Sequence, residues 1–295
     1  MSRSLEGRIA AITGAGRGIG REHALLFASE GAKVVVNDLG GAADGTGEDA
    51  SAAQAVVDEI EAAGGEAVAN HDDVSTWDGA AGLVAQAVDA YGRLDVLVNN
   101  AGILRDAFIV SMTEEQWDAV LAVHLKGHFC ALHHAGAHWR ERSKAGEEVR
   151  AAVVNTASGS GTFMPNAGQV NYGAAKAGIA ALSLVASQEL GRYGVRVNAI
   201  APVARTRLTV QTPGPIGEMM KEPDDPDAFD AFHPRHVSPL VAYLAGEDCE
   251  LTGKLFSVQG GAISELSGWT VEDGITTDGD WSVEQIAAQL GGARV

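Results

Sequence analysis

A glycine-rich loop near the start of the chain constrains the possible folds more than any other feature. The loop, Gly14-Ala15-Gly16-Arg17-Gly18-Ile19-Gly20, lies between an apolar run at residues 8–13 and a helical pattern at residues 21–30. A strand, a glycine loop and a helix in this order form a dinucleotide-binding unit, because glycines permit the tight turn and let the backbone approach a pyrophosphate. The unpaired N–H groups at the helix N-terminus then face the anion.

An acidic residue at the end of the next strand predicts which dinucleotide this unit binds. The apolar run at residues 33–37 leads into Asp38, 18 residues after Gly20. At about this offset an acid accepts hydrogen bonds from the adenosine ribose of NAD, and its charge repels the 2′-phosphate of NADP. The alternative is an Asp that only begins the following loop. Arg17 opposes the assignment, because a basic side chain here could reach a 2′-phosphate. We predict NAD.

Alternating strand and helix patterns continue through the rest of the chain. Strands are predicted at residues 66–69, 94–98, 151–156, 195–200 and 254–258, and helices at residues 52–63, 76–91, 113–139 and 237–246. This alternation predicts an α/β chain with a doubly wound Rossmann fold, in which a mainly seven-stranded parallel sheet carries helices on both faces. We expect a single dinucleotide-binding catalytic domain over residues 1–295.

Three segments lie outside this alternation. Residues 40–50 are rich in Gly, Asp and Ala and exceed the usual strand-to-helix connection, so we expect a flap beside the adenosine. Residues 207–232 are rich in Pro, Gly and acids and contain Met219-Met220, which favours a flexible lid over a substrate, with plain disorder as the alternative. Residues 265–295 form a C-terminal extension.

Tyr172 and Lys176 are the strongest candidates for catalysis. They lie four residues apart in a helical stretch, so their side chains face the same way. A cation beside a phenol favours the phenolate and can pull its pKa from about 10 towards the range of an acid/base catalyst. The alternative is a Tyr and a Lys that merely line a helix surface.

Other polar residues follow predicted strands and converge on the same crevice. Ser158 and Asn99 each come after a strand, and ligands of open α/β sheets bind at the carboxyl ends of the strands. Asp73 is placed to accept from the adenine amino group, and Asp72 could serve instead.

Charge and composition argue against several other functions. The 295 residues carry a net charge of −18, which repels nucleic acid and anionic membranes. The chain has no run of 18 apolar residues, and its two cysteines, Cys130 and Cys249, lie far apart with no paired spacing. We therefore expect no nucleic-acid or membrane partner, no metal site and a cytoplasmic location.

The motifs taken together resemble the short-chain dehydrogenase/reductase family over nearly the whole chain. They are Thr13-Gly14-x-x-x-Gly18-x-Gly20, Asn99-Asn100-Ala101-Gly102, Ser158, Tyr172-x-x-x-Lys176 and Asn198-x-x-x-Pro202. More narrowly, Val35–Gly41, Val68-Ala69-Asn70, Val123–Gly127 and Gly168-Gln169-x-Asn171-Tyr172 resemble the dehydrogenase domain of the peroxisomal multifunctional enzyme type 2, which oxidises (3R)-hydroxyacyl-CoA and has 17β-hydroxysteroid dehydrogenase activity.

The resemblance implies roles for these residues. Tyr172 would be the general acid/base, Lys176 would tune it and hold the nicotinamide ribose, and Ser158 would hydrogen-bond the substrate oxygen. It implies cofactor contacts from Gly14, Arg17, Gly18, Ile19, Gly20, Asp38, Asp73, Val74, Asn99, Asn100, Ala101, Gly102, Tyr172, Lys176 and Thr206. It also implies a homotetramer or homodimer, with the long helices near His124 and Tyr172 packing across a twofold axis.

The chain departs from the family pattern at three positions. Ser158 precedes Tyr172 by one residue more than is usual, which makes Ser160 a weaker alternative. Val203 stands where a Gly usually follows Pro202. His124 replaces an Asn whose backbone carbonyl holds a water in the proton path from the lysine, and the multifunctional enzyme's domain shares this His. The His124 side chain could join that path or only pack beside the site.

Several functions fit these residues. The leading one is an NAD-dependent oxidoreductase acting on a 3-hydroxyacyl-CoA. Alternatives are a hydroxysteroid or cyclic alcohol dehydrogenase, a 3-oxoacyl carrier reductase, and a non-catalytic NAD-sensing regulator, although such regulators commonly lose the Tyr or the Lys. A bound CoA would need cations at the mouth of the site, and the candidates are Arg105, Arg205, Arg207 and Lys221, which could equally be solvated surface charges.

Overall fold

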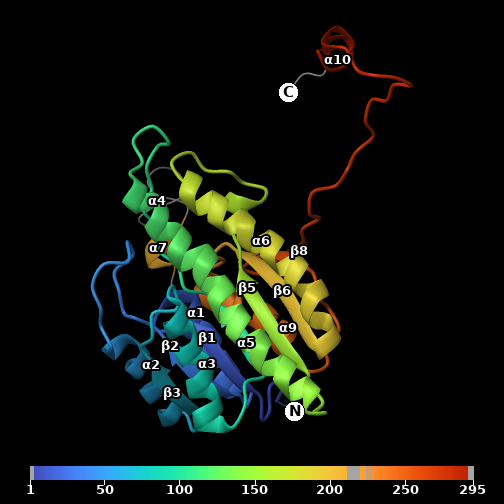
Figure 1. Cartoon of the computed structure of the whole chain (residues 1–295). Helices are drawn as coiled ribbons and strands as arrows, with labels where there is room; N and C mark the ends of the chain where they lie inside the picture. The colour runs from blue at the N-terminus through green and yellow to red at the C-terminus, as the bar shows by residue number, and fades with distance from the viewer. Residues whose placement is uncertain (1–2, 211–219, 224, 226–227, 292–295) are drawn as a thin grey trace.

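One sheet of eight strands forms the centre of the molecule (Figure 1). The computed structural model describes residues 3–210, 220–223, 225 and 228–291. The strand order is β3-β2-β1-β4-β5-β6-β7-β8, and all neighbours are parallel except β7 and β8. The strands are β1 Ile9–Thr13, β2 Lys33–Asn37, β3 Glu66–Asn70, β4 Val96–Asn99, β5 Ala151–Thr156, β6 Val195–Pro202, β7 Leu255–Gln259 and β8 Ala262–Glu265. The predicted doubly wound parallel sheet is confirmed, with an antiparallel eighth strand at its edge.

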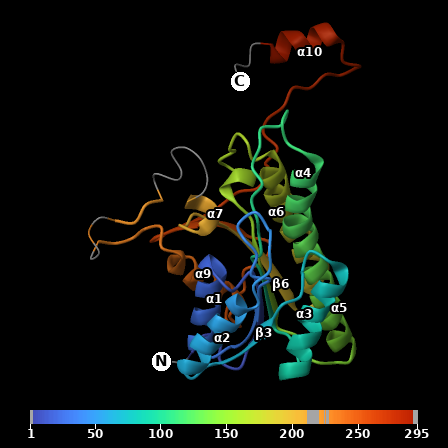
Figure 2. The same ribbon diagram turned by 90° about the vertical axis from the view of Figure 1, so that its left-hand side faces the viewer.

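Helices cover both faces of the sheet (Figure 2). One layer holds α1 (Gly18–Ser29), α2 (Ser51–Ala62) and α9 (Ser238–Ala245). The opposite layer holds α3 (Trp77–Tyr91), α4 (Glu114–Leu121), α5 (Gly127–Lys144) and α6 (Val170–Leu190). The short helix α7 (Arg207–Val210) follows β6 near the carboxyl ends of the strands. Among the described residues no helix has the length and apolarity needed to cross a membrane.

The composition of the strands explains this layering. Every residue of β1, β4 and β5 is buried, and the apolar positions are mainly Val, Ile and Ala. Strands with two buried faces need a helix layer on each side, since β-branched side chains leave both sheet surfaces apolar. One cluster of buried residues, including Phe27 and Leu244, lies on the α1 side, and a second, including Leu83 and Trp139, lies on the α5 side.

The helix expected at residues 113–139 contains an irregular turn. Thr113 and Gln116 form a capping box at the start of α4, and a π-helix, Ala122–Lys126, separates α4 from α5. π-Turns are often found at functional sites because the widened turn re-aims side chains. This turn carries Val123 and His124, which line the main cavity.

The C-terminal residues form an extended arm beyond β8 (Figure 1). The arm ends in α10, Val283–Leu290, which begins with a capping box between Ser282 and Gln285. The extension expected at residues 265–295 therefore includes a short helix away from the sheet. Of the lid expected at residues 207–232, most of the middle, Met219 included, lies outside the described residues.

Candidate active site

A cavity opens at the carboxyl ends of β1 and β4, where the strand order reverses direction. The glycine loop forms its floor, and close packing accounts for the glycines. Gly14 has φ +63°, and a Cβ there would meet the Cα of Ala101 at 2.7 Å. A Cβ at Gly20 would meet the Gly14 carbonyl oxygen at 2.1 Å. Larger side chains would therefore push the loop away from β4.

The N-terminus of α1 provides an anion site beside this floor. Arg17 occupies the N-cap position but makes no side-chain capping hydrogen bond. The first N–H groups of the helix therefore keep no side-chain acceptor, as a phosphate-binding helix requires. Gly18 and Ile19 line the cavity at this point. The loop and helix could therefore hold the pyrophosphate of a dinucleotide.

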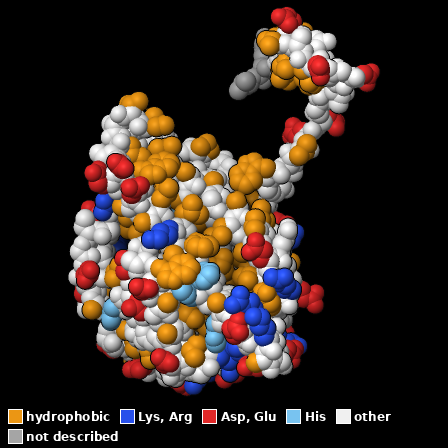
Figure 3. Space-filling view, viewed as in Figure 1, with side chains coloured by type: hydrophobic (Ala, Val, Ile, Leu, Met, Phe, Trp, Pro, Cys, Tyr) orange, Lys and Arg blue, Asp and Glu red, His pale blue; other side chains and the backbone are white. Residues whose placement is uncertain are grey.

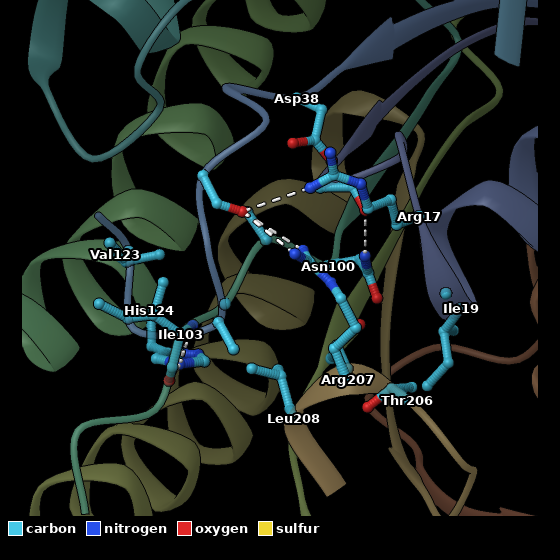
Figure 4. A pocket seen from close by; sticks show the side chains of 18 of the residues that line it. Arg17, Ile19, Asp38, Asn100, Ile103, Val123, His124, Thr206, Arg207 and Leu208 are labelled. Atoms are coloured by element: carbon cyan, nitrogen blue, oxygen red, sulfur yellow. Dashed lines mark hydrogen bonds between the residues drawn. The ribbon is translucent and has the colours of Figure 1, made fainter. Parts of the chain in front are cut away.

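Asp38 lies at the adenosine end of the cavity, beside Arg17 (Figure 4). One of its carboxylate oxygens accepts from the Gly16 N–H at 2.8 Å, and the other accepts from the Gly40 N–H at 2.6 Å. These backbone donors hold the carboxylate in place while leaving each oxygen further lone pairs for a ribose hydroxyl.

The opposite wall of the adenosine end carries Asp72, Asp73 and Val74. The Asp72 carboxylate accepts from the Asn70 side-chain amide at 2.7 Å, and Asp73 accepts from the Ser75 N–H at 2.9 Å. Both acids line the cavity, so the choice between them for the adenine amino group stays a prediction.

The two asparagines after β4 have different surroundings. Asn100 lines the cavity, and its amide donates to the carbonyls of Thr13 and Gly14 at 3.1 and 3.0 Å, which ties the glycine loop to β4. The Asn99 side chain is buried and donates to the Asn155 side chain at 2.9 Å. We expected Asn99 to contact the nicotinamide half of the cofactor. The structure instead directs its amide into the packing between strands, because β5 offers a buried acceptor there.

Tyr172 and Lys176 lie at the other end of the cavity. Lys176 is 2% exposed, and its ammonium donates to the Thr156 carbonyl at the end of β5. The Lys176 Nζ lies 5.6 Å from the centroid of the Tyr172 ring. A side-chain hydrogen bond joins Tyr172 to Ser158. Serine, tyrosine and lysine thus form one group beside the cavity, and such a group can move a proton at an alcohol or carbonyl oxygen.

The family comparison agrees with this geometry. Residues 8–212 match the family model described as short chain dehydrogenase. The chain belongs to the short-chain dehydrogenase family. It is therefore an oxidoreductase that acts on CH–OH groups with a dinucleotide cofactor.

Three relatives place this dehydrogenase more closely. A protein of Mycobacterium tuberculosis named hydroxyacyl-CoA dehydrogenase is 43% identical over 97% of this chain and 88% of its own length. The peroxisomal multifunctional enzyme type 2 of Drosophila melanogaster is 42% identical over 90% of this chain but only 40% of its own. The crystal structure of a short chain dehydrogenase from Mycobacterium avium is similar with a TM-score of 0.85 and 50% identity, covering 99% of this chain and 97% of that one.

Burial shifts the pKa values of both Tyr172 and Lys176. Burial lowers the pKa of Lys176 from 10.5 to about 7. Burial also raises the pKa of the Tyr172 phenol. The hydrogen bond with Ser158 lowers this pKa, and the charge of Asp106 raises it further. We expected the lysine to lower the tyrosine pKa. Loss of hydration outweighs that effect, since the buried lysine itself tends to lose its charge.

His124 lies beside Tyr172 and is held by the loop after β4. The two rings are in edge contact, with centroids 5.1 Å apart. The His124 Nε2 accepts from the Ile103 N–H at 3.1 Å and also lies 2.8 Å from the Ile103 carbonyl oxygen, whereas Nδ1 has no hydrogen-bond partner among the described residues. Burial and the charge of Lys176 hold the pKa of His124 well below 6.5. The imidazole is therefore neutral near pH 7.

A polar network at the start of α6 was missed by sequence reasoning. Gln169 donates to Asp106 at 2.9 Å, and its side-chain oxygen accepts from Ser160 at 3.0 Å. Asn166 donates to Ser160 at 2.9 Å. Ser160 is thus engaged in positioning the loop, whereas Ser158 contacts Tyr172, which favours Ser158 for the substrate oxygen. Burial raises the pKa of Asp106. No spacing in the sequence links these residues, because they come from two separate loops.

The cations considered for CoA have other partners. Arg205 pairs with Asp230 and donates to the Met220 carbonyl, so it anchors the end of the lid segment. Arg105 donates to the Asp44 carbonyl at 2.8 Å. Arg207 donates to the Gly41 carbonyl, and Lys221 is exposed. Thr206, a predicted cofactor contact, lines the cavity beside Gly18. Among the described residues no cluster of His, Cys, Asp and Glu is arranged to hold a metal ion.

Proposed function

We propose that this chain oxidises the 3-hydroxyl group of a hydroxyacyl-CoA, with NAD as hydride acceptor. The observation that carries the proposal is one continuous cavity lined by Gly18 and Asp38 at one end and by Tyr172 and Lys176 at the other. The substrate class follows from the names of the relatives, since a hydroxyacyl-CoA dehydrogenase is 43% identical over 88% of its own length.

The protein's contribution to this reaction is orientation and proton transfer. The cofactor supplies a nicotinamide ring that accepts the hydride from the carbinol carbon. Ser158 would donate to the substrate oxygen, and the Tyr172 phenolate would take the hydroxyl proton as the C–H electrons leave. The products are a 3-oxoacyl thioester, reduced cofactor and a proton on Tyr172. Lys176, while it is protonated, would stabilise the phenolate, and it would pass the proton towards solvent.

NAD rather than NADP is supported by Asp38. Backbone N–H groups of Gly16 and Gly40 hold its carboxylate at the adenosine end of the cavity. A 2′-phosphate would bring a second anion next to it, at a cost of a few kcal/mol in a partly desolvated site. A catalytic efficiency with NADP equal to that with NAD would contradict this choice.

Exposed apolar residues near Tyr172 support an acyl chain as the substrate body. A bridge between Ala107 and Gln169 joins the loop after β4 to the loop before α6. Both loops present large apolar side chains to solvent, which favours an apolar ligand across this opening. The exposed residues are Phe108, Ile109, Val110, Phe163 and Met164.

A substrate panel tests the proposal directly. We expect the rate of NADH formation at 340 nm to be high with (3R)-3-hydroxyacyl-CoA and the kcat/KM to rise with acyl length. Phe163→Ser should lower kcat/KM for long acyl chains more than for short ones, whereas Tyr243→Ser, an exposed aromatic on the opposite helix layer, should change neither. Turnover of a free 17β-hydroxysteroid or a cyclic alcohol with none of any hydroxyacyl-CoA would reject the thioester.

We also propose that the enzyme assembles as a homodimer or homotetramer through α5 and α6. Hydrophobic side chains gather on the face formed by these helices (Figure 3). Phe129 on α5 is 47% exposed, and Val185 on α6 is 56% exposed. A closed twofold assembly would cover such side chains. Molar mass from light scattering tests this, and a monomer at micromolar concentration would contradict it.

A further inference from the structure

The flap between β2 and α2 contains a second acid that bears on cofactor choice. The flap comprises residues 40–50 and lines the cavity near Asp38. It carries Asp49, which contacts Arg17 of the glycine loop. Arg17 is the cation in the glycine loop, on the cavity wall beside Asp38 (Figure 4). A guanidinium in this place would suit a 2′-phosphate, because its planar fork binds phosphate in bidentate fashion.

Both terminal nitrogens of the Arg17 guanidinium have partners within the protein. Its Nη2 lies 3.1 Å from an Asp49 carboxylate oxygen. Its Nη1 donates to the Gly40 carbonyl at 3.2 Å and contacts the Gly41 carbonyl at 3.5 Å. Arg17 therefore faces the flap, and a phosphate would have to compete with a carboxylate for it.

The flap holds Asp49 firmly in this position. The Asp49 N–H donates to the Leu39 carbonyl at 2.9 Å, and its second carboxylate oxygen accepts from the N–H and the hydroxyl of Ser51. Those hydrogen bonds from Ser51 lower the pKa of Asp49. Gly40 has φ +74° and packs so closely that a Cβ would meet the Asp49 carbonyl oxygen at 2.0 Å. The Asp49 carboxylate is thus charged, hydrogen-bonded within the flap and directed at Arg17, and the ion pair is partly exposed to solvent.

We propose that Asp49 is a second determinant of NAD preference, acting by holding Arg17 away from the ribose 2′ position. This inference rests on the NAD preference proposed above and deepens it. Asp38 repels a 2′-phosphate directly, whereas Asp49 withholds the cation that would bind it. Removing Asp38 alone therefore leaves Arg17 committed to the flap, and efficient use of NADP requires the loss of both acids.

A mutant cycle measured by binding tests the proposal without any substrate. The dissociation constants of NAD and NADP would be measured for the parent, Asp38→Asn, Asp49→Asn and the double variant, and again for all four with Arg17→Gln. Each variant is described by the factor by which it raises NADP affinity relative to NAD affinity. We expect this factor in the double variant to exceed the product of the factors in the two single variants by at least about fivefold, which lies within the range measured for coupled neighbours. The excess should vanish with Arg17→Gln.

Controls separate the role of Asp49 from a general loss of charge or structure. Glu48→Gln removes one negative charge from an exposed neighbouring residue in the same flap and should leave the NADP/NAD ratio within about twofold of the parent. Asp49→Ser gives a second test if Asp49→Asn unfolds, which circular dichroism would reveal. The proposal would be overturned if the change in relative NADP affinity of the double variant equalled the product of the changes in the two single variants. It would also be overturned if the excess over that product persisted with Arg17→Gln. A parent that binds NADP better than NAD would refute the proposed cofactor, while the dependence on Arg17 would still decide the role of Asp49.

Discussion

Replacing Lys176 by Met should abolish catalysis while making the protein more stable at neutral pH. The Lys176 ammonium is buried, and its pKa falls from 10.5 in water to about 7 in the fold. At pH values below both pKa values, a depression of this size destabilises the fold by about 5 kcal/mol, since each pKa unit corresponds to about 1.36 kcal/mol. Met fills a similar volume without a charge. The buried Lys176 therefore lowers the stability of the fold while serving the proposed reaction.

The cost in folding stability of burying the Lys176 charge depends on pH. Between pH 7 and pH 10.5 the unfolded chain binds more protons than the folded chain, so the penalty is full below pH 7 and fades as pH rises towards 10.5. The penalty is about 4 kcal/mol at pH 7 and about 2 kcal/mol at pH 9. Losing the hydrogen bond to the Thr156 carbonyl costs about 1–3 kcal/mol at either pH. Lys176→Met should thus be more stable than the parent by roughly 1–3 kcal/mol at pH 7.

Urea unfolding of both proteins at pH 7 and pH 9 measures this difference. The stability advantage of Lys176→Met should shrink by about 2 kcal/mol over that interval. Lys126→Met removes an exposed lysine from the neighbouring π-turn and should show no such pH dependence. An advantage that is equal at the two pH values would refute the argument, because it would mean that Lys176 keeps an ordinary pKa in the fold.

Further predictions concern the residues around Lys176. Tyr172→Phe should retain NAD binding and lower turnover by about 10²–10⁴-fold, as expected for lost acid/base catalysis, and a smaller loss would point to another base. Ser158→Ala should lower kcat more than Ser160→Ala, and the reverse order in steady-state kinetics would assign the substrate contact to Ser160. Asp106→Asn removes a charge that raises the Tyr172 pKa, so the limb of the kcat–pH profile that rises with pH should move to lower pH. His124→Asn should stay active, whereas His124→Ala should slow turnover. Any limb of the kcat–pH profile that is due to His124 should lie well below pH 6.5. An unchanged rate for His124→Ala would leave only the backbone of this residue in the proton path.

The sequence was sufficient to predict the fold and several of the residues that line the cavity. Short buried strands and amphipathic helices alternate regularly, so the parallel sheet follows from local pattern. Gly14 and Asp38 were predictable for a related reason, since each directly follows a strand whose carboxyl end lies at the same edge of the sheet, and Tyr172 was predictable from its spacing to Lys176.

Contacts between distant loops could not be predicted in this way. Nothing local marks Asn99 as a partner of Asn155 or Arg205 as a partner of Asp230. The direction of the Lys176 pKa depends on how completely neighbouring chains exclude water, and no spacing of residues records that. The π-turn before α5 was also absent from the prediction, because a single widened turn hardly changes the periodicity of the helix.

Transfer of deuterium from substrate to cofactor is the most direct test of the proposed function. The enzyme would be incubated with NAD and a (3R)-3-hydroxyacyl-CoA that carries deuterium at C3, and the reduced cofactor would be examined by NMR. We predict one deuterium at C4 of the nicotinamide for each 3-oxoacyl-CoA formed, at a rate that falls with Tyr172→Phe. Binding of both ligands without deuterium at C4 would contradict the account.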